Sequence, residues 1–205
     1  MYNGIALLTG GSYAQWASLP SSHILPLPNK LTFLEGAAIP EAWLTAFQLL
    51  RLAEVKKGHH VVIYAGASGV GTAAVQLCNL LGAHPWAVVS TEQKGKICHE
   101  LGAKGVVFYK NNETWAKDLI KMKGGNFDAV LDCVGPSNSD STLQLLGMDG
   151  KWILYGLLSG AKSNLNMAMT LVKRISIIST TLKTRTDEYK AELVSDFRST
   201  ALQSF

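Results

Sequence analysis

The sequence has few charged residues, few cysteines and no long apolar runs, and each shortage excludes a class of protein. Charged residues make up 17% of its 205 residues, and 19 Lys and Arg against 15 Asp and Glu leave a net charge of +4. The basic residues are scattered, which argues against nucleic acid. No stretch approaches the roughly 20 apolar residues of a membrane helix, and residues 1–8 lack the pattern of a secretory leader. We therefore expect a cytoplasmic protein without nucleic-acid or membrane partners.

The three cysteines, Cys78, Cys98 and Cys133, lie far apart, with no CxxC pair and no histidine cluster to complete a tetrahedral zinc site. We expect reduced thiols and no metal. The pair His59-His60 has no Cys or acidic partner nearby, which favours ordinary surface histidines. Because no histidine partner is suggested for Cys133, we interpret it as a packed thiol and not as a nucleophile.

The sequence is rich in short β-branched runs that alternate with longer amphipathic runs, beginning near Tyr64. This alternation is typical of βαβ units and a parallel sheet. Strands are predicted at 61–64, 86–89, 106–109, 129–132, 152–155 and 175–179. Helices are predicted at 40–52, 72–81, 93–101, 113–122, 138–146, 165–173 and 187–202. The pattern predicts an α/β fold with a doubly wound parallel sheet, the Rossmann fold.

The first forty residues differ in kind from the rest. Gly10-Gly11-Ser12 and three prolines break them into short extended pieces and turns. We interpret residues 1–40 as the tail of another domain and residues 41–205 as the domain that contains the sheet.

The segment 61–77 is a buried strand, a turn of small residues and a helix that follows at once. Glycines let the backbone turn sharply and approach a ligand closely, and a helix start presents unpaired N–H groups and partial positive charge. A Gly-rich turn alone is weak evidence. Here a strand precedes it, a helix follows, and a second strand ends about twenty residues later, as the dinucleotide fingerprint requires. We therefore predict a dinucleotide-binding domain.

The end of that second strand favours NADPH over NADH. NAD-preferring domains commonly place a carboxylate there, whereas this sequence has Ser90 and Thr91, followed by Lys94. The hydroxyls can donate hydrogen bonds to a 2′-phosphate, and the lysine can neutralise its charge. The alternative is that Ser90 caps the next helix and Lys94 is solvated. Glu92 lies close by, and its carboxylate complicates the choice between NADPH and NADH.

With these features in place, the chain resembles the medium-chain dehydrogenase/reductase superfamily, specifically its zinc-free quinone oxidoreductases. The segment 11–16 resembles the strand that closes the GroES-like catalytic barrel of that family, 39–47 its helix into the cofactor domain, and 65–71 its nucleotide loop. The segments 128–135, 150–156 and 180–185 follow in the order of the family. The resemblance implies that residues 1–40 are a remnant of the catalytic domain. It also implies hydride transfer from NADPH to quinones or related electron-poor acceptors.

The resemblance also implies a set of cofactor-binding residues. Those implied at the pyrophosphate are Ser68, Gly69, Val70 and Gly71; at the 2′-phosphate, Ser90 and Lys94; at the adenosine, Tyr109; and towards the nicotinamide, Gly135, Gly156, Leu157 and Leu158. Each has a simpler explanation, since Tyr109 can merely end a strand and the two glycines can merely form turns. Thr45 is implied near the cofactor cleft, where its hydroxyl can position the nicotinamide; alternatively, it bonds its own helix backbone.

The sequence departs from the family by omission at both ends, because it contains neither the barrel strands expected before Met1 nor the return to the barrel expected after the final helix. Hydride transfer needs donor and acceptor held together in a dry pocket, so we expect impaired turnover. Residues 2–27 would lack sheet partners, which favours association between copies or disorder. Two functions therefore stay open: an NADPH-dependent quinone reductase, and a non-catalytic NADPH-binding or interaction module.

Overall fold

A computed structural model of the chain describes residues 4–6 and 11–205. The chain forms two compact units, Met1–Gln48 with Thr181–Phe205, and Leu49–Thr180. The sequence suggested a boundary at residue 40 and kept the last helix with the sheet. In the structure, that helix instead belongs to the same unit as the N-terminal residues.

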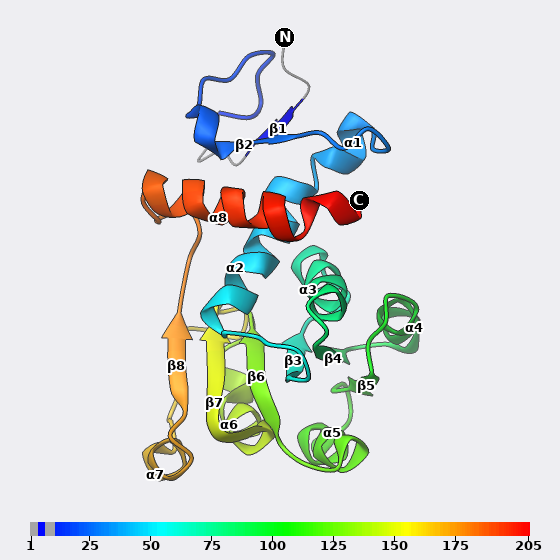
Figure 1. Cartoon of the computed structure of the whole chain (residues 1–205). Helices are drawn as coiled ribbons and strands as arrows, with labels where there is room; N and C mark the ends of the chain where they lie inside the picture. The colour runs from blue at the N-terminus through cyan, green and yellow to red at the C-terminus, as the bar shows by residue number, and fades with distance from the viewer. Residues whose placement is uncertain (1–3, 7–10) are drawn as a thin grey trace. The chain divides into compact units, whose positions relative to one another are not determined.

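The second unit is built on a six-stranded parallel sheet (Figure 1). Its strands are β3 (His60–Tyr64), β4 (His84–Val89), β5 (Gly105–Phe108), β6 (Phe127–Asp132), β7 (Leu146–Leu154) and β8 (Ser176–Ser179). They lie in the order β5-β4-β3-β6-β7-β8, and each neighbouring pair is parallel. The chain starts in the middle, moves outward to β5, and returns to add β6 beside β3. This is the doubly wound order, so the predicted Rossmann fold is confirmed.

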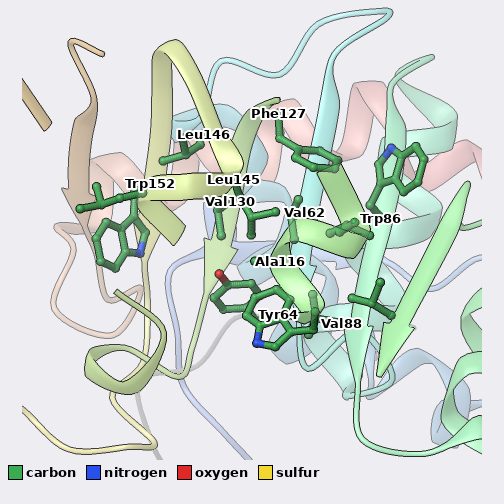
Figure 2. Packing of buried hydrophobic residues seen from close by; sticks show 14 of the residues in the cluster. Val62, Tyr64, Trp86, Val88, Ala116, Phe127, Val130, Leu145, Leu146 and Trp152 are labelled. Atoms are coloured by element: carbon green, nitrogen blue, oxygen red, sulfur yellow. The ribbon is translucent and has the colours of Figure 1, made fainter. Parts of the chain in front are cut away.

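The strands form because their apolar runs are buried on both faces of the sheet. Val61, Val62 and Ile63 are fully buried (0% exposed), as expected for a parallel strand covered by helices on each side. On one face, aromatic rings from the strands pack edge to face with their neighbours (Figure 2). The centroid of Trp86 lies 5.7 Å from that of Phe127. This packing fixes the strands whose carboxyl ends carry the candidate site.

The helices of this unit are α3 (Gly69–Leu80), α4 (Glu92–Glu100), α5 (Trp115–Lys123), α6 (Ser139–Leu145) and α7 (Met167–Val172), with a short 3-10 helix, η3 (Pro136–Asn138). Side chains of Ser68, Thr91 and Asn166 cap three of them by accepting a backbone N–H of the first turn. Gly124, at a left-handed φ of 79°, ends α5. The predicted helices are present within a few residues, and α3 starts at Gly69, earlier than predicted.

Strand β7 differs from its prediction. It begins at Leu146, directly after α6, whereas the sequence predicted a helix to 146 and a strand only from 152. Its pairing with β6 jumps from Phe127 opposite Leu146 to Ala129 opposite Lys151, which marks a bulge. Within the bulge Asp149 has a φ of 58°, and its carboxylate accepts two hydrogen bonds from Arg174, at 2.7 and 2.6 Å. Two glycines, at positions 147 and 150, gave this bulge the composition of a turn.

The first unit combines two short strands with helices from both ends of the chain. Its elements are β1 (Gly4–Ala6), η1 (Ser21–His23), β2 (Ile24–Pro26), α1 (Phe33–Gly36), the π-turn η2 (Ile39–Trp43), α2 (Leu44–Leu52), which crosses into the second unit, α8 (Asp187–Thr200) and η4 (Leu202–Ser204). Phe47 packs against Phe197 at 5.5 Å between ring centroids, and His23 Nε2 lies 3.1 Å from the carbonyl oxygen of Asp187. In the described part of the chain, no helix combines the length and apolarity needed to cross a bilayer.

Two predictions for the N-terminal residues need correction. The segment 11–16, predicted as a strand, consists of bends and irregular backbone, with Tyr13 and Trp16 largely exposed. An extended segment is stable only with a paired neighbour, and here β1 and β2 pair with each other. The expectation that residues 2–27 lack sheet partners is therefore wrong for those two strands. Gly10 and the other residues of 1–3 and 7–10 lie outside the described residues.

A histidine at the amino end of β3 gives the fold a dependence on pH. His60 Nδ1 accepts a hydrogen bond from the indole Nε1–H of Trp86, at 3.0 Å, so this ring nitrogen must be unprotonated. Burial lowers the pKa of His60, as do the charge of Lys123 and the neighbouring His84, whereas Asp128 opposes this shift. The folded state thus disfavours the protonated imidazole. The resulting stability is present above the unfolded pKa, about 6.5, and is lost as pH falls through the folded pKa.

We expect the free energy of unfolding to fall between pH 7 and pH 5, and His60→Asn to reduce that loss. Asparagine keeps an acceptor near the position of Nδ1 but cannot take up a proton. Urea unfolding at several pH values measures the effect, with His99→Asn, at an exposed histidine of α4, as the control. An unchanged pH dependence in the His60 variant would assign the loss to other groups.

Candidate dinucleotide-binding site

The chain leaves β3 through a tight turn, residues 65–68, that ends in a helix start. Ser68 is extended, and its hydroxyl accepts a hydrogen bond from the N–H of Gly71 at 3.1 Å. Because the cap lies at Ser68, the first turn of α3 begins as soon as this short turn ends. Within the described residues, the N–H groups of Gly69 and Val70 have no hydrogen-bond acceptor. They are therefore available to an anion, which the helix dipole also favours.

Two glycines are required by close packing at this turn. A Cβ at position 71 would overlap the carbonyl oxygen of Ala65 and lie 2.6 Å from that of Gly66. A Cβ at position 66 would lie 2.7 Å from the Cβ of Ala87 on the neighbouring strand. Only glycine lets the helix start this close to the turn and the turn this close to β4.

A pocket of about 400 Å³ opens beside the turn. It lies at the carboxyl ends of β3, β4 and β5 and is completed by the loops after β6 and β7. The strand order reverses between β3 and β6, and doubly wound sheets bind ligands at this reversal. The lining residues are Tyr64, Ala65, Ala67, Ser68, Val88, Val89, Ser90, Lys94, Tyr109, Val134, Ser137, Asn138, Leu158 and Ser159. We call this cavity the nucleotide pocket.

A hydroxyl and an ammonium group meet at the end of β4. Lys94 Nζ donates a hydrogen bond to Ser90 Oγ at 3.3 Å, and both residues line the nucleotide pocket. The cap of α4 is Thr91, which accepts the N–H of Lys94 at 3.4 Å, so the alternative that Ser90 caps this helix is wrong. Tyr109 directly follows β5, is half exposed and also lines this pocket.

The loop after β6 is anchored by the carboxylate of Asp132, which is fully buried. One oxygen accepts the N–H groups of Val134 and Gly135, at 2.7 and 2.9 Å, and the other accepts the indole N–H of Trp152 at 2.9 Å. Burial raises the pKa of this carboxyl, although the hydrogen bonds oppose the shift. Gly135 has a φ of 81° and a ψ of −127°, a conformation reserved for glycine, so the carboxylate holds a sharp turn in place.

The structure brings five of the predicted site residues into one pocket: Ser68, Ser90, Lys94, Tyr109 and Leu158. The predicted residues Gly69, Val70 and Gly71 form the adjacent helix start. Gly135 and Leu157 instead line a second cavity, of about 260 Å³, with apolar walls. Gly156 lies against the β6 loop, where a Cβ would be 2.8 Å from the carbonyl oxygen of Cys133. Thr45 belongs to α2 in the first unit, and its role stays a prediction.

Sequence reasoning missed several lining residues of the nucleotide pocket. They come from the loops after β6 and β7: Val134, Ser137, Asn138 and Ser159. The usable signal was their position, since each follows a predicted strand at the edge where parallel strands end together. Their residue types carry no motif.

The structure adds detail on the cysteines and on the side chains that could hold a metal ion. Among the described residues, no three His, Cys, Asp or Glu side chains gather as a metal site would require. Burial raises the pKa of Cys78 to about 12 and also raises that of Cys133. Cys133 is half buried directly after β6, and its thiol therefore stays protonated and weakly reactive at neutral pH.

Fold and pocket together define a dinucleotide-binding α/β protein, and comparison with known proteins gives its family. The zinc-binding dehydrogenase family model matches residues 69–197. The chain belongs to this family, within the medium-chain dehydrogenase/reductase superfamily. It is 33% identical to human (Homo sapiens) quinone oxidoreductase over 181 residues, which cover 87% of this chain and 54% of that protein. The chain thus spans about half the length of the curated quinone oxidoreductases it matches.

Solved structures agree with this placement. The quinone oxidoreductase of Thermus thermophilus, determined alone and with NADPH, aligns with a TM-score of 0.82 at 26% identity, covering 98% of this chain and 63% of that one. The Escherichia coli quinone oxidoreductase complexed with NADPH aligns with a TM-score of 0.77 at 28% identity, covering 90% of this chain and 58% of that one.

We expect Gly71→Ala to destabilise the second unit by roughly 1–3 kcal/mol, the usual effect of forcing an extra methyl group into a packed site. Chemical denaturation measures the change. The matched control is Gly147→Ala, because a Cβ there meets only ordinary contacts, 3.4 Å from Asn126 Cβ and 3.6 Å from the carbonyl oxygen of Phe127. Equal stability of the two variants would contradict the close approach described here.

Proposed function

We propose that the chain binds NADPH in the nucleotide pocket. The observation that carries the proposal is the Ser90–Lys94 pair, which lines the same pocket as the capped start of α3. The helix start is suited to the pyrophosphate, and the hydroxyl and ammonium are suited to a 2′-phosphate. The relatives solved with NADPH support this assignment.

We further propose that the activity of the protein is transfer of hydride from NADPH to quinones or related electron-poor acceptors, without zinc. The kinship with quinone oxidoreductases supports the acceptor class. The separation of Cys78, Cys98 and Cys133 on different elements supports zinc independence. NADPH supplies the hydride when bound, and the chain's residues hold and orient it. Within this proposal, residues 1–40 belong to the catalytic domain, Thr45 positions the nicotinamide, and the location is cytoplasmic.

A second candidate function is a cofactor-binding module without turnover. One observation favours it: all the residues that line the nucleotide pocket fall within 64–159, inside the second unit. Binding therefore requires only this unit, whereas hydride transfer also requires a site that holds the acceptor against the nicotinamide.

NADPH fluorescence titration, followed by NADPH oxidation assays with a panel of benzoquinones and naphthoquinones, separates the two functions. We expect binding in both cases, since the pocket is the same. Oxidation that depends on the quinone supports the reductase, and binding without oxidation assigns the module to this polypeptide. Lack of NADPH binding would overturn both.

We expect Lys94→Ala to weaken NADPH binding by roughly tenfold or more, because it removes the charge that faces the 2′-phosphate. NADH lacks this phosphate, so its affinity should change by less than about twofold. The control is Lys96→Ala on the same helix, where the ammonium lies 4.0 Å from Glu100 and is exposed. Equal losses for NADPH and NADH in Lys94→Ala would reject the assignment of the 2′-phosphate site.

A further inference from the structure

The loops that follow β6 and β7 are hydrogen-bonded to each other along their length. Near the strands, the N–H of Leu158 donates to the carbonyl oxygen of Cys133 at 3.1 Å. Beyond the β6 loop, the hydroxyl of Ser139, the first residue of α6, lies 2.7 Å from that of Ser163. The close packing of Gly156 on Cys133 leaves no room for a side chain between the loops.

Ser159 is the centre of this network. Its N–H and its hydroxyl both donate to the carbonyl oxygen of Val134, at 2.9 and 2.8 Å. The same hydroxyl accepts the N–H of Ser137 at 3.0 Å. Val134 is therefore held on both sides, since its N–H is bound by Asp132 at 2.7 Å. One serine thus fixes the path of the β6 loop from Val134 to Ser137.

The tied loops form a wall with a cavity on each side. Val134, Ser137 and Asn138 face the nucleotide pocket, whereas their neighbours Gly135 and Pro136 line the apolar cavity. Successive parts of this one loop therefore face different cavities. Any shift of the loop changes the wall of the nucleotide pocket directly.

We propose that Ser159, which itself lines the nucleotide pocket, is a positioning residue for the cofactor and holds Val134, Ser137 and Asn138 at the pocket wall. The inference rests on the NADPH function proposed above. The inference goes beyond that function because it assigns part of the cofactor affinity to the loop after β6. In the strand order, β6 lies on one side of β3, whereas β4, which carries the Ser90–Lys94 pair at its end, lies on the other. The role is therefore independent of the 2′-phosphate, and it should affect NADPH and NADH alike.

The test measures NADPH and NADH affinity in Ser159→Ala, with thermal unfolding alongside. The variant loses both hydroxyl hydrogen bonds, which are exposed to solvent, so we expect affinity for each nucleotide to fall by about fivefold. The ratio of the two affinities should stay the same, in contrast to Lys94→Ala. Ser159→Thr keeps the hydroxyl and should restore affinity to within about twofold.

Ser163→Ala is the matched control, because it removes a hydroxyl contact between the β7 loop and the start of α6, at a residue that lines the apolar cavity and not the nucleotide pocket. Its affinities should match the parent. Unchanged affinity in Ser159→Ala, or an equal loss in Ser163→Ala, would overturn the positioning role. If the parent protein binds neither nucleotide, the proposed function itself fails, so the two failures are distinguishable.

Discussion

The contact on which the site depends is the approach of helix α3 to the turn after β3. Without a side chain at Gly71, the first turn of the helix rests on the carbonyl groups of Ala65 and Gly66, and the Ser68 cap places the N–H groups of Gly69 and Val70 directly after the turn. Helix dipole and unpaired N–H groups then face the same small volume. A longer turn would move that charge away from the strand ends that form the pocket.

The opposite wall depends on polar contacts instead of close packing. The buried carboxylate of Asp132 holds the loop after β6 from the strand side, and Ser159 holds it from the neighbouring loop. A carboxylate this deeply buried is costly to place unless its oxygens are hydrogen-bonded. Here both oxygens have donors, including the indole of Trp152. The side chain of Asp132 thus joins Trp152 in the core to the loop that forms the pocket wall.

Within the proposed function, charge is the basis of selectivity for NADPH, because the pocket walls are otherwise apolar or neutral. Lys94 is the cation among the lining residues, and it sits in the first turn of α4 beside Ser90. Its charge is exposed, so we expect it to act through contact with a 2′-phosphate more than through a long-range field. All the residues that line the pocket lie within one unit, although the chain spans about half the length of the curated relatives it matches.

The sequence alone predicted the sheet, the turn after β3 and the Ser90–Lys94 pair, because strand burial, glycine spacing and the residues at a strand end can be read locally from the sequence. It did not determine the bulge in β7, where Gly147 and Gly150 have the local composition of a turn but pairing with β6 extends the strand. Only the tertiary structure separated Gly135 and Leu157 from the nucleotide pocket and brought Ser159 to Val134. Those positions depend on contacts between loops distant in sequence, and the residue pattern of either loop by itself does not reveal such contacts.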